Sequence, residues 1–208
     1  MNDSESQRKR ALRLSYLTVG YNIVEGVVSI AAGVLSGSIA LVGFGLDSAV
    51  ESLSGGVMIW RFGKRRAFSE EEEEKVERRA SRLVAYTFFI LAAYILFESV
   101  RKLWYREVPE PSLFGIAVAV VSIVVMPILA RAKYRLGKQL GSRSLVADSK
   151  ETMACFFLSV ALLIGLGLNY IAGLWQADPI VGLIICGYLV KEGRETLEDE
   201  DEEDDDDD

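Results

Sequence analysis

The residues best suited to chemistry in this chain are acidic side chains and a cysteine embedded in apolar blocks. Asp47 and Glu51 lie four residues apart in one block, and Glu151 and Cys155 repeat this separation in another. If both blocks are helices, each pair shares one helix face with its side chains about 6 Å apart, so two ligands can reach one cation. Two such pairs that face each other would supply four ligands, which suits a tetrahedral shell around a divalent metal ion.

Two further carboxylates have more than one interpretation. Asp148 lies one turn before Glu151, where it forms the inner approach of a metal site, or else only caps its helix or meets the membrane interface. Glu25 follows Asn22 by about one turn in the first apolar block. It either makes a hydrogen bond that packs helices together or plays an accessory part near the site.

Long apolar stretches predict the elements that position these residues. Half of the 208 residues are hydrophobic, and a helix needs roughly 20 mostly apolar residues to cross a bilayer. The sequence therefore predicts an all-α membrane protein with six transmembrane helices, at Leu14–Leu35, Ser38–Trp60, Leu83–Leu103, Ser112–Ala130, Ser144–Tyr170 and Ala177–Val190. Around this domain, at residues 11–197, we expect a polar N-terminal segment at 1–10 and a disordered acidic tail at 198–208.

The depth of the acidic residues supports a common site. At about 1.5 Å per residue, Glu51 lies roughly 14 Å from the end of its predicted helix near Trp60, and Glu151 roughly 11 Å from the end near Ser144. A carboxylate at such depth costs a few kcal/mol unless it faces the bundle interior and has a partner. Because the six predicted spans contain no basic residue at the depth of Asp47 and Glu51, the expected partner is a bound cation or protons.

Basic residues predict the topology of the chain. They cluster before the first span, between the second and third spans and after the fourth, at Arg8, Lys9, Arg10, Arg13, Arg61, Lys64, Arg65, Arg66, Lys75, Arg78, Arg79, Arg82, Arg131, Lys133, Arg135, Lys138 and Arg143. Since lysine and arginine are retained on the cytoplasmic side, we expect a multi-pass protein of the plasma membrane with both termini in the cytoplasm.

Acidic runs account for the formal net charge of −7. They lie at Glu70–Glu74 and Glu198–Asp208. Such runs are typically solvated segments without fixed structure, and the alternative is that they gather cations at the cytoplasmic mouth.

A faint internal repeat links the two blocks that carry the ligand pairs. The sequence Gly-Ser-Ile-Ala-Leu-Val begins at Gly37 and Gly-Ser-Arg-Ser-Leu-Val begins at Gly141, and each runs into an Asp-Ser pair, at Asp47 and Asp148. Repeated halves are common in transporters, where the substrate binds between the repeats.

Three motifs together resemble the membrane domain of the cation diffusion facilitators, nearest to their short, transmembrane-protein-163-like branch. The motifs are Ser38-Ile-Ala-Leu leading to Asp47-Ser-Ala-Val-Glu51, Ala147-Asp148-Ser-Lys-Glu151 leading to Cys155, and Ala177-Asp178-Pro179-Ile180. The resemblance implies that helices 1, 2, 4 and 5 surround a tetrahedral site, with helices 3 and 6 paired outside. It also implies that zinc or a similar ion is exchanged for protons. By position, Asp47 and Glu51 match the ligand pair of helix 2, and Glu151 and Cys155 match that of helix 5.

The chain departs from that family pattern at its ligands. Glu151 occupies the position usually held by histidine, Cys155 occupies that of the following aspartate, and the chain contains no histidine. Zinc remains the first candidate, but loss of imidazole shifts the preference toward harder ions, so manganese, iron and cobalt are alternatives. Because only a short acidic tail follows Val190, any homodimer is expected to form through the membrane helices.

These observations predict a divalent metal cation transporter that works by efflux, as a metal/proton antiporter. Metal and protons compete for the same carboxylate oxygens, so their exchange is a natural coupling. The expected partners are membrane lipid, the transported cation and protons, with no resident cofactor. The alternative is a non-transporting membrane adaptor or assembly protein that keeps the fold. An enzyme is not expected, and the topology explains the basic loops without nucleic-acid binding.

Overall fold

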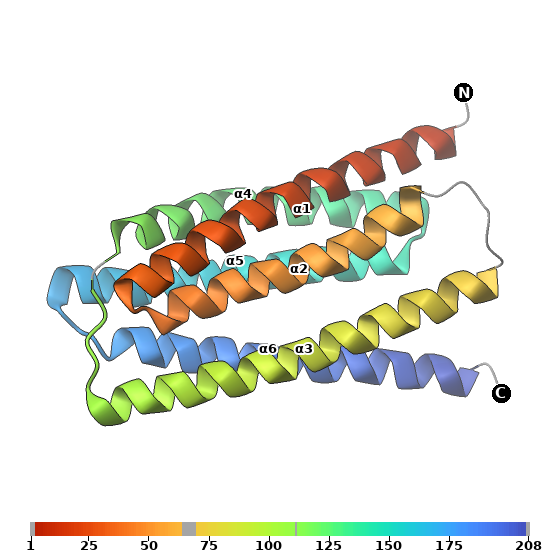
Figure 1. Cartoon of the computed structure of the whole chain (residues 1–208). Coiled ribbons are helices and arrows are strands. Elements are labelled where there is room, and N and C mark those ends of the chain that lie inside the picture. The colour runs from red at the N-terminus through yellow and green to blue at the C-terminus, as the bar shows by residue number, and fades with distance from the viewer. Residues whose placement is uncertain (1–2, 64–69, 111, 207–208) are drawn as a thin grey trace.

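The computed structural model describes residues 3–63, 70–110 and 112–206 of the chain, and these form a bundle of six helices (Figure 1). The helices are α1 (Asp3–Ser36), α2 (Ile39–Gly63), α3 (Glu70–Tyr105), α4 (Leu113–Leu140), α5 (Arg143–Ala172) and α6 (Ala177–Asp206). The described residues include no strand. The predicted all-α class and the number of helices are therefore confirmed.

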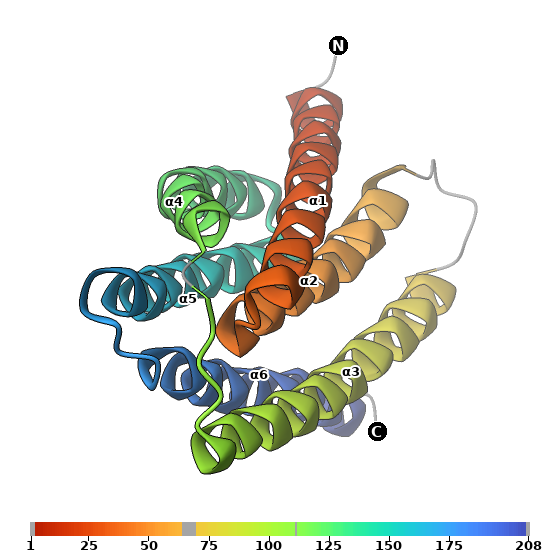
Figure 2. The ribbon, with the colours of Figure 1, turned by 60° about the vertical axis from the view of Figure 1, so that its left-hand side comes forward.

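The helices associate in three pairs. Two are the hairpins α1–α2 and α4–α5, and the third pairs α3 with α6. Helix α2 also packs against α3, α5 and α6, and α1 packs against α4. Figure 2 shows the α3–α6 pair on one side of the two hairpins. The four helices predicted to enclose a site are thus α1, α2, α4 and α5, with α3 and α6 along one flank.

Several helices extend beyond the predicted spans. Helix α4 continues past Ala130 to Leu140, so the basic residues expected in a following loop lie on the helix itself. Helix α1 already begins at Asp3, within the predicted polar segment, and α6 runs through the predicted acidic tail to Asp206. A helix needs only its own backbone hydrogen bonds to continue past an apolar stretch. The basic residues Lys64, Arg65 and Arg66 of the predicted cytoplasmic loop lie outside the described residues.

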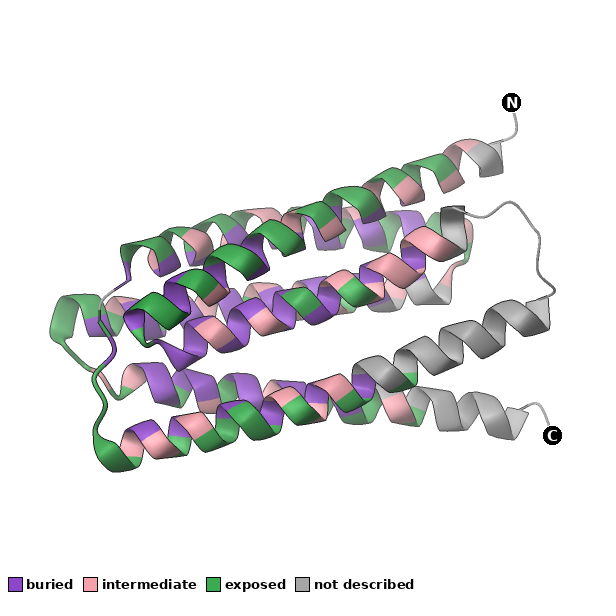
Figure 3. Cartoon of the chain, viewed as in Figure 1, coloured by how far each residue is buried: buried purple, intermediate pink, exposed green. Residues whose placement is uncertain are grey.

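Many residues on the outside of the bundle are exposed (Figure 3), and a large share of them are apolar. Val27 of α1, Phe114 of α4 and Phe157 of α5 are each more than 60% exposed. Exposed apolar surface on this scale indicates a lipid or protein environment rather than water. By length and apolar composition, α1, α4 and α5 each contain a stretch suited to crossing a membrane, at 6–36, 113–140 and 148–172.

The two hairpins turn in the same way. Gly37 and Gly141 have φ angles of 67° and 63°, a left-handed conformation that favours glycine at a helix end. The serine that follows each glycine then caps the next helix: Ser38 Oγ accepts from the Leu41 backbone N–H, and Ser142 Oγ accepts from that of Leu145. The repeat noted in the sequence is therefore a repeat of the helix–turn–helix unit.

Asp178 and Lys102 fasten the α3–α6 pair to the α1–α2 turn. Asp178 begins α6 and is fully buried. Its carboxylate accepts hydrogen bonds from the Ser38 hydroxyl and from the Ile39 backbone N–H, the latter at 2.9 Å, so it caps α2 from another helix. Lys102 at the end of α3 donates to the Gly37 carbonyl oxygen in the same turn. These contacts tie together three pieces of chain that are distant in sequence.

Replacing Asp178 by alanine is expected to lower the free energy of unfolding by about 2 kcal/mol, because it removes two hydrogen bonds to a buried charged group. Asp178→Asn should lose less, since the amide oxygen can still accept. The measurement is thermal unfolding of the purified protein in detergent. The control is Gln176→Ala, since Gln176 is exposed in the α5–α6 turn, two residues before Asp178. Equal unfolding temperatures for Asp178→Ala and Gln176→Ala would contradict this assignment.

Candidate metal site between the two hairpins

The two predicted ligand pairs occupy equivalent positions in the two hairpins. Asp47 and Glu51 lie nine and thirteen residues after the capping Ser38, and Glu151 and Cys155 lie nine and thirteen residues after the capping Ser142. The Asp-Ser pairs of the sequence repeat match Asp47 with Asp148, whereas in the structure Asp47 is equivalent to Glu151, three residues further on. Helix-capping geometry, rather than the Asp-Ser pairs, defines the equivalence.

The hairpins have opposite directions, and this brings the pairs to one depth. The α1–α2 turn and the α4–α5 turn lie at opposite ends of the bundle (Figure 1). At about 1.5 Å per residue, Glu51 lies roughly 20 Å from its turn and Glu151 roughly 14 Å from the other. The sum of these two distances is close to the roughly 30 Å thickness of the hydrocarbon core of a bilayer. Inverted repeats therefore explain why the two pairs meet near the middle.

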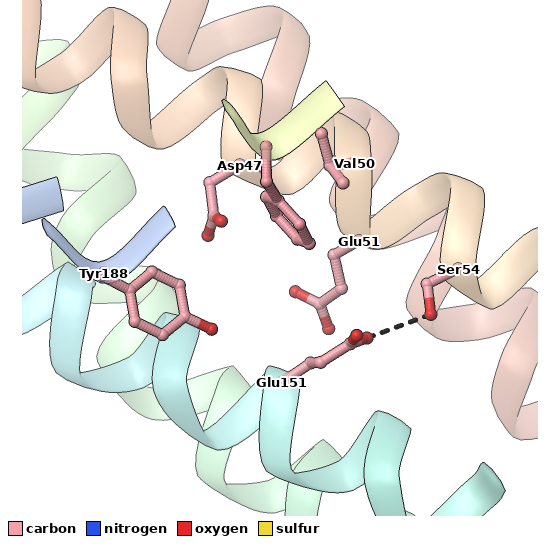
Figure 4. Close-up of a pocket in the computed structure, with 7 residues that line it drawn as sticks. Asp47, Val50, Glu51, Ser54, Glu151 and Tyr188 are labelled. Atoms are coloured by element: carbon pink, nitrogen blue, oxygen red, sulfur yellow. Dashed lines mark hydrogen bonds between the residues drawn. The ribbon is translucent and has the colours of Figure 1, made fainter. Parts of the chain in front are cut away.

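A cavity lies between these pairs. It is small, with room for about one water molecule, and its lining residues are Asp47, Val50, Glu51, Ser54, Phe88, Glu151 and Tyr188. Figure 4 shows the carboxylates of Asp47, Glu51 and Glu151 directed toward this shared space, with the Tyr188 hydroxyl pointing the same way. The Ser54 hydroxyl donates to Glu151 Oε2 at 3.0 Å. Phe88 of α3 and Tyr188 of α6 close one side, so the outer helix pair also contributes to the wall.

Cys155 completes the set from behind the cavity wall. Its side chain is 1% exposed, and its thiol lies against the Asp47 carboxylate. Asp47 of α2 thus contacts α5 directly, which joins the two pairs. Both cysteines of the chain are free and buried, so no disulfide joins them.

In this arrangement the ligands surround a space rather than close a shell. Among the described residues, no three acidic or cysteine side chains are already close enough to hold one ion together. The donor set nevertheless fits a divalent cation, because carboxylates and a thiolate are metal ligands.

Lys133 lies beside the candidate site, although its position in the sequence predicts a loop residue. Its side chain is 1% exposed, and its ammonium nitrogen lies 2.9 Å from Asp148 Oδ2 and 3.7 Å from Glu51 Oε1. It also donates to the Thr152 hydroxyl at 2.7 Å, and that hydroxyl donates to Glu51 Oε1 at 2.5 Å. A cation of the protein itself therefore lies beside the acidic pair of α2.

This contact corrects the prediction that no basic residue lies at the depth of Asp47 and Glu51. The fourth apolar stretch ends at Ala130 and so predicts that Lys133 lies in a loop, but α4 continues to Leu140 and Lys133 is on its buried face. The signal was present in the helical spacing, since the buried face of α4 passes through Met126, Leu129, Lys133 and Leu136.

Asp148 does not cap α5. The N-cap of that helix is Ser142, and Asp148 lies more than one turn inside it with a 3% exposed side chain. Its carboxylate forms the ion pair with Lys133. The capping alternative is therefore wrong, and Asp148 belongs to the network beside the predicted site.

Glu25 joins three helices. Its carboxylate accepts hydrogen bonds from the hydroxyls of Tyr21 on α1 at 2.9 Å, Ser48 on α2 at 2.8 Å and Ser122 on α4. These contacts favour the packing role over an accessory role in cation binding. Asn22 is fully buried, and neither of its amide atoms has a hydrogen-bond partner among the described residues.

The model of the cation efflux transmembrane domain matches residues 15–200. The chain belongs to the cation efflux family. It is therefore a membrane protein, and the resemblance found in its motifs is confirmed.

Relatives of this cation efflux domain are distant in sequence but similar over most of the chain. It is 24% identical to Transmembrane protein 163 of Xenopus laevis, over 95% of this chain and 70% of that protein. It is 28% identical to an uncharacterized transporter of Methanocaldococcus jannaschii, over 84% of this chain and 63% of that protein. It is 25% identical to a probable cation efflux system protein of Mycobacterium tuberculosis, over 91% of this chain and 57% of that protein. The chain thus spans between 57% and 70% of the length of these relatives.

Proposed function

We propose that the chain transports a divalent metal cation across the membrane, bound by Asp47, Glu51, Glu151 and Cys155 and exchanged for protons. The observation that supports the proposal is the inverted pair of hairpins, in which Asp47, Glu51 and Glu151 line one cavity and the Cys155 thiol lies against Asp47. Membership of the cation efflux family and the names of two relatives support cation transport. Zinc is the first candidate, and manganese, iron or cobalt are alternatives because the site has no imidazole.

The site suits alternating access. Substrates of transporters with inverted repeats bind near the bilayer midplane, between the repeats. Metal and protons compete for the carboxylate oxygens of Asp47, Glu51 and Glu151, so protons can replace the cation as it leaves. This coupling limits the charge that remains in the low-dielectric interior after each release.

The proposed orientation is efflux from the cytoplasm through the plasma membrane, with both termini cytoplasmic. The start of α1 and the end of α6 lie at the same end of the bundle (Figure 1). That end also carries the basic residues Arg131, Arg135 and Lys138 of α4, which favours the cytoplasmic side. A homodimer would form through the exposed apolar faces of the membrane helices.

Flux through proteoliposomes tests the proposal. With a pH gradient and a metal-sensitive dye inside, the wild type is expected to carry Zn²⁺ or Mn²⁺ at a rate at least about tenfold above Asp47→Asn. The variant removes one charged ligand from the site, and a tenfold change corresponds to about 1.4 kcal/mol. Glu195→Gln, an exposed acidic position of α6, is the control and should transport like wild type.

Two outcomes would contradict parts of the proposal. Equal flux for Asp47→Asn and wild type would refute the site. Metal binding without flux in the wild type would instead support the non-transporting adaptor.

A further inference from the structure

Lys133 lies at a place where a bound cation would compete with it. Its ammonium nitrogen is 3.7 Å from Glu51 Oε1, while Glu51 Oε2 has no hydrogen-bond partner among the described residues. A metal ion binds a carboxylate oxygen at about 2 Å. A divalent cation on Glu51 and the Lys133 ammonium would then lie within several ångströms of each other in a buried site, where like charges repel strongly.

Asp148 offers Lys133 a second anionic partner outside the cavity. The 2.9 Å contact to Asp148 is shorter than the contact to Glu51, and Asp148 does not line the cavity. Thr152 connects Lys133 to Glu51, because its hydroxyl accepts a hydrogen bond from Lys133 and donates one to Glu51. Lys133 can therefore give up Glu51 without becoming an unpaired buried charge.

The charged pair is present in one hairpin and absent from the other. Lys133 lies nine residues before the capping Ser142, and the matching position before Ser38 is Ser29. Asp148 lies six residues after Ser142, and the matching position after Ser38 is Phe44. The two hairpins supply equivalent ligands, but only the α4–α5 hairpin supplies this ion pair.

We propose that Lys133 is the counter-cation of the metal site: its ammonium group neutralises Glu51 and Asp148 until a divalent cation binds Glu51, and then remains with Asp148 alone. This inference rests on the proposed cation site. It assigns Lys133 a positioning role, since the lysine acts on the ligands and not on the metal. Lys133 then keeps the affinity of the site for the cation weak enough for release. It also lowers the net negative charge of the site when no metal is bound.

The test compares metal binding by wild type, Lys133→Gln, Lys133→Arg and the control Lys138→Gln, all purified in detergent. Lys138 lies on the same helix with an exposed side chain. Competition with a metal-binding dye measures the affinity for Zn²⁺ and Mn²⁺. Thermal unfolding with and without metal measures how strongly the cation stabilises each variant.

Lys133→Gln is expected to bind metal at least about tenfold more tightly than Lys138→Gln, because the competing positive charge is gone. Its metal-free form should unfold at a lower temperature, and metal should raise that temperature more than in wild type. Lys133→Arg keeps the charge and should stay within about threefold of the wild-type affinity. Affinity of Lys133→Gln equal to or below that of Lys138→Gln would overturn the inference.

A Lys133→Gln protein that does not fold without metal would still decide the question. The inference expects Zn²⁺ or Mn²⁺ to restore its folding, since the cation replaces the missing charge, and failure of both ions to do so would overturn it. Failure of the wild type itself to bind either ion would contradict the proposed function instead. The two failures are therefore distinguishable in one set of measurements.

Discussion

Glu51→Gln is expected to lower the affinity for Zn²⁺ or Mn²⁺ by at least about 100-fold. Changes to groups that only orient a metal ligand typically reduce metal affinity about 10–100-fold, so loss of a charged ligand should reduce it further. Glutamine keeps the size of the side chain, and its amide oxygen can still accept the hydrogen bond from Thr152. The effect would therefore report the lost charge rather than a lost fold.

The measurement is dye competition on the purified protein, with Glu107→Gln as the control. Glu107 is a half-exposed carboxylate just after α3 that pairs with Arg101 and does not line the cavity. The control should bind metal like wild type. A Glu51→Gln protein that binds metal within threefold of the control would remove Glu51 from the site.

Gly45→Ala is expected to lower the free energy of unfolding by about 3 kcal/mol, because α1 and α2 touch backbone to backbone at this residue. A β-carbon on Gly45 would lie 2.9 Å from the Gly26 carbonyl oxygen and 2.9 Å from the Ile30 backbone nitrogen. Backbone atoms cannot rotate away as a side chain does, so the two helices would have to separate. Since Asp47 is two residues further along α2, metal binding should also weaken.

Gly56→Ala is the matched control on the same helix. A β-carbon at Gly56 would meet no atom within 4 Å, and alanine is a better helix former by about 1 kcal/mol. This variant is therefore expected to be as stable as wild type or slightly more so. Thermal unfolding in detergent compares the two, and equal stability of both variants would contradict the close contact between α1 and α2.

The number of helices, and the one-turn separation of Asp47 from Glu51 and of Glu151 from Cys155, could be predicted from the sequence. Six apolar stretches gave six helices because the bilayer sets a minimum apolar length for a spanning helix. The four-residue spacing of Asp47 and Glu51, and of Glu151 and Cys155, placed each pair on one helix face because that spacing is about one turn. The motifs at these positions also identified the family correctly.

Helix ends and partners could not be predicted in the same way. Apolar composition marks the part of α4 that meets lipid, whereas the helix itself continues to Leu140 on its own hydrogen bonds. Lys133 consequently looked like a loop residue. Its spacing from Leu129 and Leu136 could have placed it on the buried face, but nothing in the sequence shows that Asp148 and Glu51 meet it there.

The sequence alone determined which residue types are available, their spacing along each helix and the apolar lengths that make helices of them, because these are local properties of the chain. Only the tertiary structure decided that the two hairpins run in opposite directions around one cavity, that Glu25 is bound by three hydroxyls and that a lysine lies beside Glu51. These contacts join residues as far as 97 positions apart in the sequence. Such contacts depend on how whole helices pack, and packing is a property of all the side chains together.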